Sequence, residues 1–265
     1  MAHSETGAAR AGGKPRDAVV YVYGVVPADV EENPEATGVG EPPSPVKLVR
    51  SGEIAALVGE IPSGVALGTP EDLTAHARVL DSAAAEVPVL PLRFGAVVTD
   101  LDAVANEFLE PNAESFAGIL RDLEGRAQFV LRGRYDGDAM IRELMDEDPR
   151  IGQLRGEIHG KPEEVTRDAR IALGELIGRA VQAKREADTR VLASALDELG
   201  FPVVAGEATN EWDAANVACL VELSRQDELR EAAERFAEQQ DGRIDLRLLG
   251  PMAAYDFVLP AEGSG

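Results

Sequence analysis

The segment from Lys161 to Gly200 constrains the fold of this chain more than any other, because it predicts one unusually long helix. Apolar residues recur along it at steps of four or three, as in one continuous seam. The residues of this predicted seam are Val165, Ala169, Ala172, Leu176, Ala180, Ala183, Ala187 and Val191. At 1.5 Å per residue, about 37 helical residues span roughly 55 Å, which exceeds an ordinary domain helix. We therefore expect part of this helix, at about residues 162–199, to project or to pack as a coiled-coil-like hairpin.

The order of elements around this helix indicates an α+β fold. From Gln128 onward the sequence predicts strand, helix, strand, strand, helix, strand, with the long helix enlarging the first crossover. This order is the split βαβ, ferredoxin-like pattern. The preceding residues predict β-β-β-α-β-α, a modified form of the same arrangement. We expect two domains, at residues 18–124 and 125–260, with a disordered Gly/Ala-rich leader over residues 1–17 and a short tail over 261–265.

The first predicted domain contains one helix with clear start signals and a second that carries a proline. Thr69 is the expected N-cap, with Pro70 at the first helical position. Four residues are expected to share one face of this helix: Leu73, His76, Ala77 and Leu80. The second helix is expected to begin after Asp100 and to be broken into two pieces by Pro111. The sequence "LPLRFGAVV" between the two helices is expected to be extended.

Charge and cysteine content exclude several functional classes. The chain has 26 Lys and Arg residues against 48 Asp and Glu residues, for a formal net charge of −22. Nucleic acids and anionic membrane surfaces bind concentrated basic surfaces, so neither is expected as a partner. No apolar run approaches the roughly 18 residues that would span a bilayer. The single cysteine, Cys219, forms no internal disulfide and lies in an apolar strand, so we expect a buried thiol in a protein of the reducing cytoplasm.

No arrangement of residues in the sequence predicts catalysis, a cofactor or a metal. The three histidines, His3, His76 and His159, are not spaced as ligands, and Cys219 has no ligand partner. No glycine-rich phosphate loop and no G-x-S-x-G elbow occurs. The aromatic residues of the apolar strands are best explained by core packing. We therefore expect no catalytic residues, no cofactor and no metal.

The stretch "EVPVLPLRFGAVV" contains one charged residue, Arg93, in an otherwise apolar run. Pro88 and Pro91 limit ladder pairing on one side of this stretch. An arginine within a buried strand has to be paired or to reach the surface, because an unpaired buried charge costs several kcal/mol. Three roles follow for Arg93: a structural ion pair or hydrogen bonds to backbone carbonyls near the first helix, a contact with a partner, or a catalytic contact.

Five stretches together resemble the gas vesicle protein F/L family, from about Val19 to Val258. They are "YVYGVV", "HARVL", "VPVLPLRFGAVV", "NVACLVEL" and "GPMAAYDFV". The most specific part is "LPLRFG" after a helix that carries "HxRVL", and the closing "GP…Y.FV" comes next. The resemblance marks nine residues as family-signature positions, either structural or at an interface: His76, Arg78, Leu92, Arg93, Phe94, Gly95, Gly250, Pro251 and Tyr255.

The resemblance implies an accessory or minor structural protein of gas vesicle assembly, not an enzyme. Members of the family are expected to contact the small apolar shell-forming protein, and other accessory proteins are further expected partners. The resemblance also implies a two-domain α+β fold of ferredoxin-like character, and a cytoplasmic protein associated with the vesicle. A strongly acidic body is well suited to keeping an apolar shell subunit from aggregating. The alternative is a small-ligand-binding regulator or an enzyme, because a ferredoxin-like scaffold hosts many functions.

Overall fold

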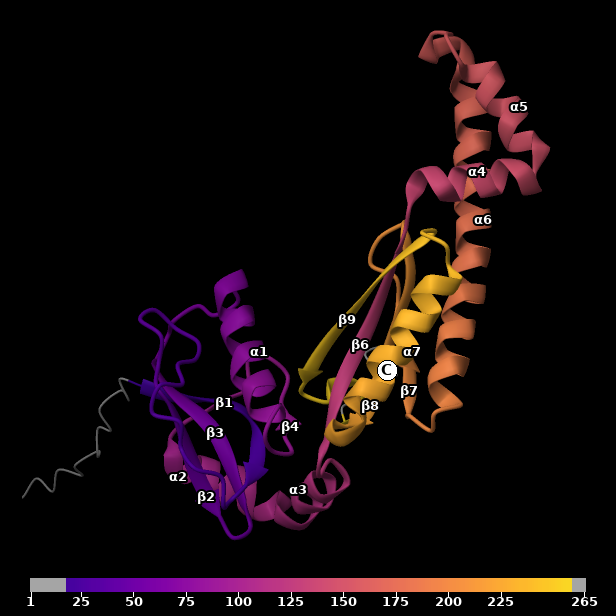
Figure 1. Cartoon of the computed structure of the whole chain (residues 1–265). Helices are drawn as coiled ribbons and strands as arrows, with labels where there is room; N and C mark the ends of the chain where they lie inside the picture. Colours follow the sequence, from indigo (N-terminus) through magenta and orange to yellow (C-terminus); the bar gives the residue numbers. More distant parts are fainter. Residues whose placement is uncertain (1–17, 259–265) are drawn as a thin grey trace, which may run out of the picture.

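The computed structural model describes residues 18–258, so the predicted leader and tail lie outside the described residues. Two antiparallel sheets form the framework, one from each half of the chain. Figure 1 shows the first sheet and its helices in indigo and purple, and the second from magenta through orange to yellow. The predicted α+β class is confirmed.

The first sheet has the strand order β2-β3-β1-β4, and β5 also pairs with β1. Its strands are β1 Ala18–Pro27, β2 Val46–Ser51, β3 Ile54–Pro62, β4 Leu90–Pro91 and β5 Val97–Val98. One face packs against α1, Pro70–Ala84, and the other against α2 Leu101–Ala103, η1 Val104–Leu109 and α3 Glu110–Asp122. Because both faces are covered, β1 is a nearly continuous run of buried residues without polar alternation.

The predicted start of α1 is confirmed, but its predicted face is partly wrong. Thr69 and Asp72 form a capping box that satisfies amides of the first turn. Leu73 is 50% exposed. The neighbouring residue Asp72 is buried instead of Leu73. Its carboxylate can be buried because it accepts hydrogen bonds from the amides of Gly40 and Gly68. The buried residues of the helix are Asp72, Ala75, His76, Val79, Leu80 and Ala84.

The prediction that Pro111 breaks the second helix is wrong. Asp100 caps its start as expected, with Oδ1 accepting from the Ala103 amide at 2.8 Å. From there α2, η1 and α3 follow one another without interruption. η1 is a π-helical turn, in which the Glu110 amide donates to the Ala105 carbonyl five residues earlier. This wider turn just before the proline accommodates a ring that would clash within a regular α-helix.

The second sheet has the strand order β7-β8-β6-β9, with every neighbouring pair antiparallel. Its strands are β6 Arg126–Tyr135, β7 Val203–Ala205, β8 Asp213–Glu222 and β9 Ile244–Met252. The helices between β6 and β7 are α4 Gly137–Glu147, α5 Pro149–Ile158 and α6 Glu163–Asp197; η2 Leu223–Arg225 and α7 Gln226–Gln239 join β8 to β9. The last strand of the pattern thus lies beside the first, as a split βαβ topology requires.

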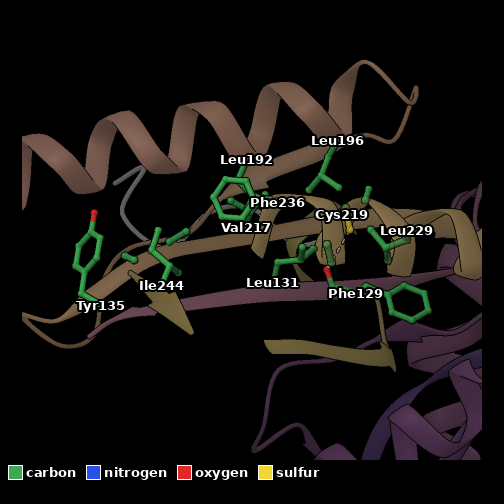
Figure 2. Close-up of a cluster of buried hydrophobic side chains, with 14 of the residues drawn as sticks. Phe129, Leu131, Tyr135, Leu192, Leu196, Val217, Cys219, Leu229, Phe236 and Ile244 are labelled. Carbon is green, nitrogen blue, oxygen red and sulfur yellow. Dashed lines mark hydrogen bonds between the residues drawn. The ribbon is translucent and has the colours of Figure 1, made fainter. Parts of the chain in front are cut away.

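A hydrophobic core fills the space between this sheet and its helices (Figure 2). Phe129, Val217 and Cys219 of the sheet belong to the same buried cluster as Leu192 and Leu196 of α6. Burial raises the pKa of the Cys219 thiol to about 12. Cys219 therefore acts as a small buried hydrophobe, as its apolar setting in the sequence predicts.

The long helix is confirmed, but its predicted apolar seam is only partly right. Leu176 and Ala180 of the seam pack against the core, whereas Ala183 and Ala187 are exposed. Val165 and Val191 are 73% and 53% exposed. The apolar residues that α6 directs into the core are Leu173, Leu176, Ile177, Ala180, Val181, Leu192, Ala193 and Leu196. The predicted seam followed evenly spaced alanines, whereas the larger Leu, Ile and Val side chains set the buried face because they remove more apolar area from water.

The N-terminal part of α6 extends beyond the second sheet, with α4 and α5 beside it (Figure 1). This agrees with the expected projection. The sequence interpretation assigned no helix to residues 149–158, where α5 lies. Asp148 caps α5 through the Arg150 amide, and His159 follows as its exposed C-cap residue.

A partly buried ionic network attaches α6 to the base of this projection. The Asp188 carboxylate accepts from both terminal nitrogens of Arg243, at 2.8 and 2.6 Å, and from the Tyr135 hydroxyl at 2.6 Å. Nearby, Lys184 Nζ contacts Glu143 at 2.6 Å and Glu147 at 2.8 Å. The two-pronged Arg243 contact fixes the orientation of α6 on the sheet.

A glycine followed by a proline, as at Gly250-Pro251, would be expected to interrupt the closing strand, but β9 does not end there. β9 continues through Pro251 to Met252, and a register shift opposite Gln128 and Val130 absorbs one extra residue of β9. The chain then forms a short helix, α8 Tyr255–Val258. Ala253 and Tyr255 join the core beneath α1. The closing segment, Ala253–Val258, therefore returns from the second sheet to the first.

Candidate functional site

The signature residues converge where α1, the Leu90–Gly95 stretch and the closing segment meet. His76 is 4% exposed, with Phe94 and Tyr255 half-buried in the same core. Leu92 approaches from the chain that follows β4. Arg78 and Arg93 are exposed at the surface. Gly95 also contributes, because its amide donates to the Tyr21 hydroxyl. Five of the nine residues thus form one junction, and Gly250 and Pro251 lie at the end of β9 that leads into it.

Both ring nitrogens of His76 have partners from different parts of the chain. Nε2 lies 3.2 Å from the Leu92 carbonyl oxygen and 3.0 Å from the Tyr255 hydroxyl. Because a carbonyl only accepts, Nε2 carries the proton. Nδ1, 2.9 Å from the Tyr21 hydroxyl, therefore accepts from it, and that hydroxyl accepts in turn from the Gly95 amide at 3.0 Å. This chain of hydrogen bonds joins β1, α1, the Arg93 stretch and the closing segment.

Aromatic rings enclose the imidazole. The Tyr23 ring stacks on it with a centroid separation of 5.7 Å, and Phe94 meets it edge-on at 5.6 Å. Burial lowers the pKa of His76, although the hydrogen bond to the Leu92 carbonyl opposes that shift. Burial also raises the pKa of Tyr21 to about 12. A neutral imidazole between neutral phenols, hydrogen-bonded on both sides, thus holds β1, α1, the Arg93 stretch and the closing segment together.

Two side chains outside the signature set attach the closing segment. Asp81 of α1 accepts a hydrogen bond from the Ala253 amide at 3.0 Å. Gln128 of β6, 2% exposed, donates to the Asp256 carboxylate at 2.6 Å and accepts from the Asp256 amide at 3.0 Å. No local sequence pattern predicts these contacts, since each joins residues more than 100 positions apart.

Two glycines permit this geometry. Gly95 has φ +95°, a conformation that side-chain-bearing residues rarely adopt. Gly250 has φ +128°, and a Cβ there would lie 2.7 Å from Phe129 Cδ1 and 2.9 Å from the Gln128 carbonyl oxygen. Backbone conformation at Gly95, and the lack of room for a Cβ at Gly250, therefore explain why glycine occupies these two signature positions.

Arg93 does not lie within a strand, contrary to the sequence interpretation. The Leu92 amide donates to the Tyr23 carbonyl at 2.9 Å, and the Val22 amide to the Ala96 carbonyl at 2.9 Å. The residues between them bulge out of the sheet, so β4 and β5 are two short pairings with β1. Arg93 is exposed on this bulge, and the cost of burying its charge does not arise.

Within residues 18–258, no group of three His, Cys, Asp or Glu side chains is placed to hold a metal ion. No helix in the same range is both long and apolar enough to cross a membrane. The geometry of the junction is that of a rigid attachment between segments.

Comparison with known proteins places this geometry in context. Residues 19–259 match the family described as "Gas vesicle synthesis protein GvpL/GvpF". Gas vesicle protein F of Streptomyces sp. strain CB03234 is 32% identical over 241 residues, covering 90% of this chain and 98% of that protein. Gas vesicle protein L of the same strain is 27% identical over 281 residues, covering 93% and 95%.

Two crystal structures share the fold. GvpF from Anabaena sp. PCC7120 superposes with a TM-score of 0.72 at 24% identity, covering 92% of this chain and 99% of that one. GvpF from Microcystis aeruginosa gives a TM-score of 0.70 at 20% identity, covering 91% and 99%. The similarity extends over both sheets and their helices.

Proposed function

The chain belongs to the GvpL/GvpF family of gas vesicle synthesis proteins, and from that premise we propose that it binds the apolar shell-forming subunit and assists vesicle nucleation or growth without turnover. Its role in gas vesicles follows from the family. The shell-subunit contact and the stage of assembly are the proposal.

The observation that carries the proposal is the extent of the match. It covers residues 19–259, which include both sheets, the projecting helices and the closing segment. A relative named gas vesicle protein F aligns over 98% of its own length. The similarity therefore spans nearly the whole of both proteins.

The surface of the chain suits an apolar partner. A shell-forming subunit with large apolar faces aggregates in water unless another protein covers them. This chain combines a net charge of −22 with exposed apolar side chains, among them Val165 and Ile171 on α6, which are 73% and 52% exposed. The negative charge would keep a complex with the subunit soluble, and the exposed apolar side chains would provide area for contact with it.

The junction around His76 supports a role without catalysis. Both ring nitrogens are occupied by groups of the chain itself, and the pKa of the imidazole is lowered by burial. We assign this junction to positioning: it keeps the first sheet, the Arg93 bulge and the closing segment in one arrangement.

Co-expression with the shell-forming subunit tests the proposal. We expect the subunit to remain in the supernatant and to co-purify with the chain, whereas the subunit expressed alone sediments. An unrelated acidic protein of similar size serves as the control for non-specific solubilisation. If the subunit sediments equally with and without the chain and none co-purifies, the proposed contact is wrong.

A further inference from the structure

We propose that the groove beside β2 is the surface that binds the shell-forming subunit, and that it accepts an extended apolar segment flanked by basic residues. This inference rests on the proposed function and adds to it a location and a partner chemistry. It is carried by a cavity, an incompletely paired strand edge and an excess of carboxylates.

The groove is a cavity of about 420 Å³ between β2, α1 and the loop that joins β1 to β2. That volume lies within the range of sites that hold a small ligand or a few side chains. Apolar side chains of three elements and of the residues after α1 line it: Val46, Leu48, Leu57, Val79 and Val87. They are continuous with the core between the first sheet and α1, so an inserted apolar side chain would extend that core.

β2 is the edge strand of the first sheet at this groove. The Val46 amide on this edge donates to the Ala36 carbonyl of the loop at 3.0 Å. The next amide on the same edge, that of Leu48, donates to a side chain, with Glu32 Oε1 at 3.1 Å. Glu32 is an exposed residue, and a side-chain cap of this kind can be replaced by a partner's carbonyl. An extended segment lying along β2 would make that exchange, as in other complexes formed at sheet edges.

The rim of the groove carries more acidic than basic side chains. Glu31, Glu32, Glu35 and Glu86 line it, against Lys47 and Arg78. Lys47 is engaged by Glu60, which does not line the groove, at 2.6 Å. Arg78 is exposed and has no hydrogen bond or ion pair with the residues of the 18–258 range.

The excess of carboxylates on the rim favours a partner that carries basic residues. A partner with Lys or Arg beside its apolar residues would bring opposite charges to Glu31, Glu35 and Glu86. A second copy of this chain is a poor occupant, because it brings a net charge of −22 to an acidic rim. In an extended segment alternate side chains point the same way, so two apolar residues separated by one position would enter the groove together.

Site-specific photo-crosslinking tests the location. A benzoylphenylalanine replaces Ser82, an exposed residue that lines the groove, and in a matched chain replaces Ser115, an exposed residue of α3 on the opposite side of the sheet. Each chain is co-expressed with the shell-forming subunit and irradiated. We expect an adduct of chain and subunit from position 82 and none from position 115.

Charge and volume variants provide the second arm. Ser82→Arg should fill the groove and lower the amount of co-purified subunit about tenfold, and Ser115→Arg should leave it within about twofold. Combined Glu31→Lys, Glu35→Lys and Glu86→Lys substitutions should also weaken binding, unlike the equal charge change made by Glu107→Lys, Glu110→Lys and Glu114→Lys on the far helices.

The outcomes separate this inference from the proposed function. If the subunit binds normally to every variant, or crosslinks from position 115 and not 82, the groove is wrong and the proposed function stands. If no form of the chain retains the subunit, both are wrong. If position 82 crosslinks only to a second copy of the chain, the groove is a self-association site and the inference is overturned.

Discussion

At the scale of single residues, His76 determines how the junction is held. Its ring bonds to Tyr21 of β1, to the Leu92 carbonyl and to Tyr255 of the closing segment. The sequence singled out His76 and Arg93 together, yet the two differ: one is buried and bonded on both sides, and the other is exposed on a bulge. The sequence alone does not show whether a polar residue reaches water. For these two residues the fold decides it.

Replacing His76 by leucine should destabilise the chain markedly. His76→Leu leaves the Tyr21 hydroxyl without its acceptor, and it leaves the Leu92 carbonyl without its donor. We expect the free energy of unfolding to fall by about 2–4 kcal/mol, measured by denaturant titration. The same substitution at the exposed His159 should change it by less than about 0.5 kcal/mol. Equal effects at both positions would contradict the assigned network.

Stability should also decrease as the solution becomes mildly acidic. The pKa of His76 is lowered in the folded state from its ordinary value of 6.5, so below pH 6.5 the unfolded state binds more protons than the folded one. Stability from this group is complete above pH 6.5 and is lost as the pH falls toward the lowered value. Each unit by which the pKa is lowered corresponds to about 1.4 kcal/mol.

Unfolding free energies at about pH 7.5 and about pH 5.5 measure this effect before most carboxylates titrate. The His76→Leu chain should lose less stability over that interval than the original chain. Identical pH dependence in the two chains would show that the imidazole is not responsible.

At the scale of elements, local signals predicted positions well and buried faces poorly. The capping residues Thr69 and Asp100 and the long helix after Pro162 were all found where predicted. The π turn before Pro111 was not, because no local pattern shows that a helix will widen to accept a proline. Among the signature residues, the sequence indicated His76 and the Arg93 stretch, but the distant partners Asp81 and Gln128 depend on how the chain closes.

Adjacent residues of α6 give a direct test of its corrected face. Leu192 is 1% exposed and Val191 is 53% exposed, although the predicted seam contained Val191. Leu192→Ala should lower the free energy of unfolding by about 2–5 kcal/mol, because it leaves a cavity between α6 and the sheet. Val191→Ala should change it by less than about 0.5 kcal/mol. A larger loss of stability from Val191→Ala than from Leu192→Ala would instead support the seam predicted from the sequence.

At the scale of the whole molecule, the closing segment joins the two sheets. Ala254 packs with Leu123 and Leu220, while Ala253 and Tyr255 pack into the core beneath α1. Gln128 holds the same segment from the second sheet through Asp256. The two halves therefore share buried contacts, and we expect them to unfold together.

Placing a charge in this shared contact should separate the halves. Ala254→Arg puts a long charged side chain where Ala254 is 3% exposed, and we expect one calorimetric transition to become two. Ala183→Arg, at an exposed position of α6, is the matched control and should keep one transition. A single unshifted transition in the Ala254→Arg chain would show that the closing segment does not couple the halves.

The most direct test of the central claim is where the shell-forming subunit is found in vesicle-forming cells that lack this chain. Flotation of lysates separates intact vesicles from sedimented aggregates, and the amount of subunit in each fraction is measured. The proposed function predicts that without the chain the subunit moves from the floating fraction to the pellet, and that supplying the chain restores flotation. Unchanged flotation of the subunit in cells that lack the chain would contradict the account.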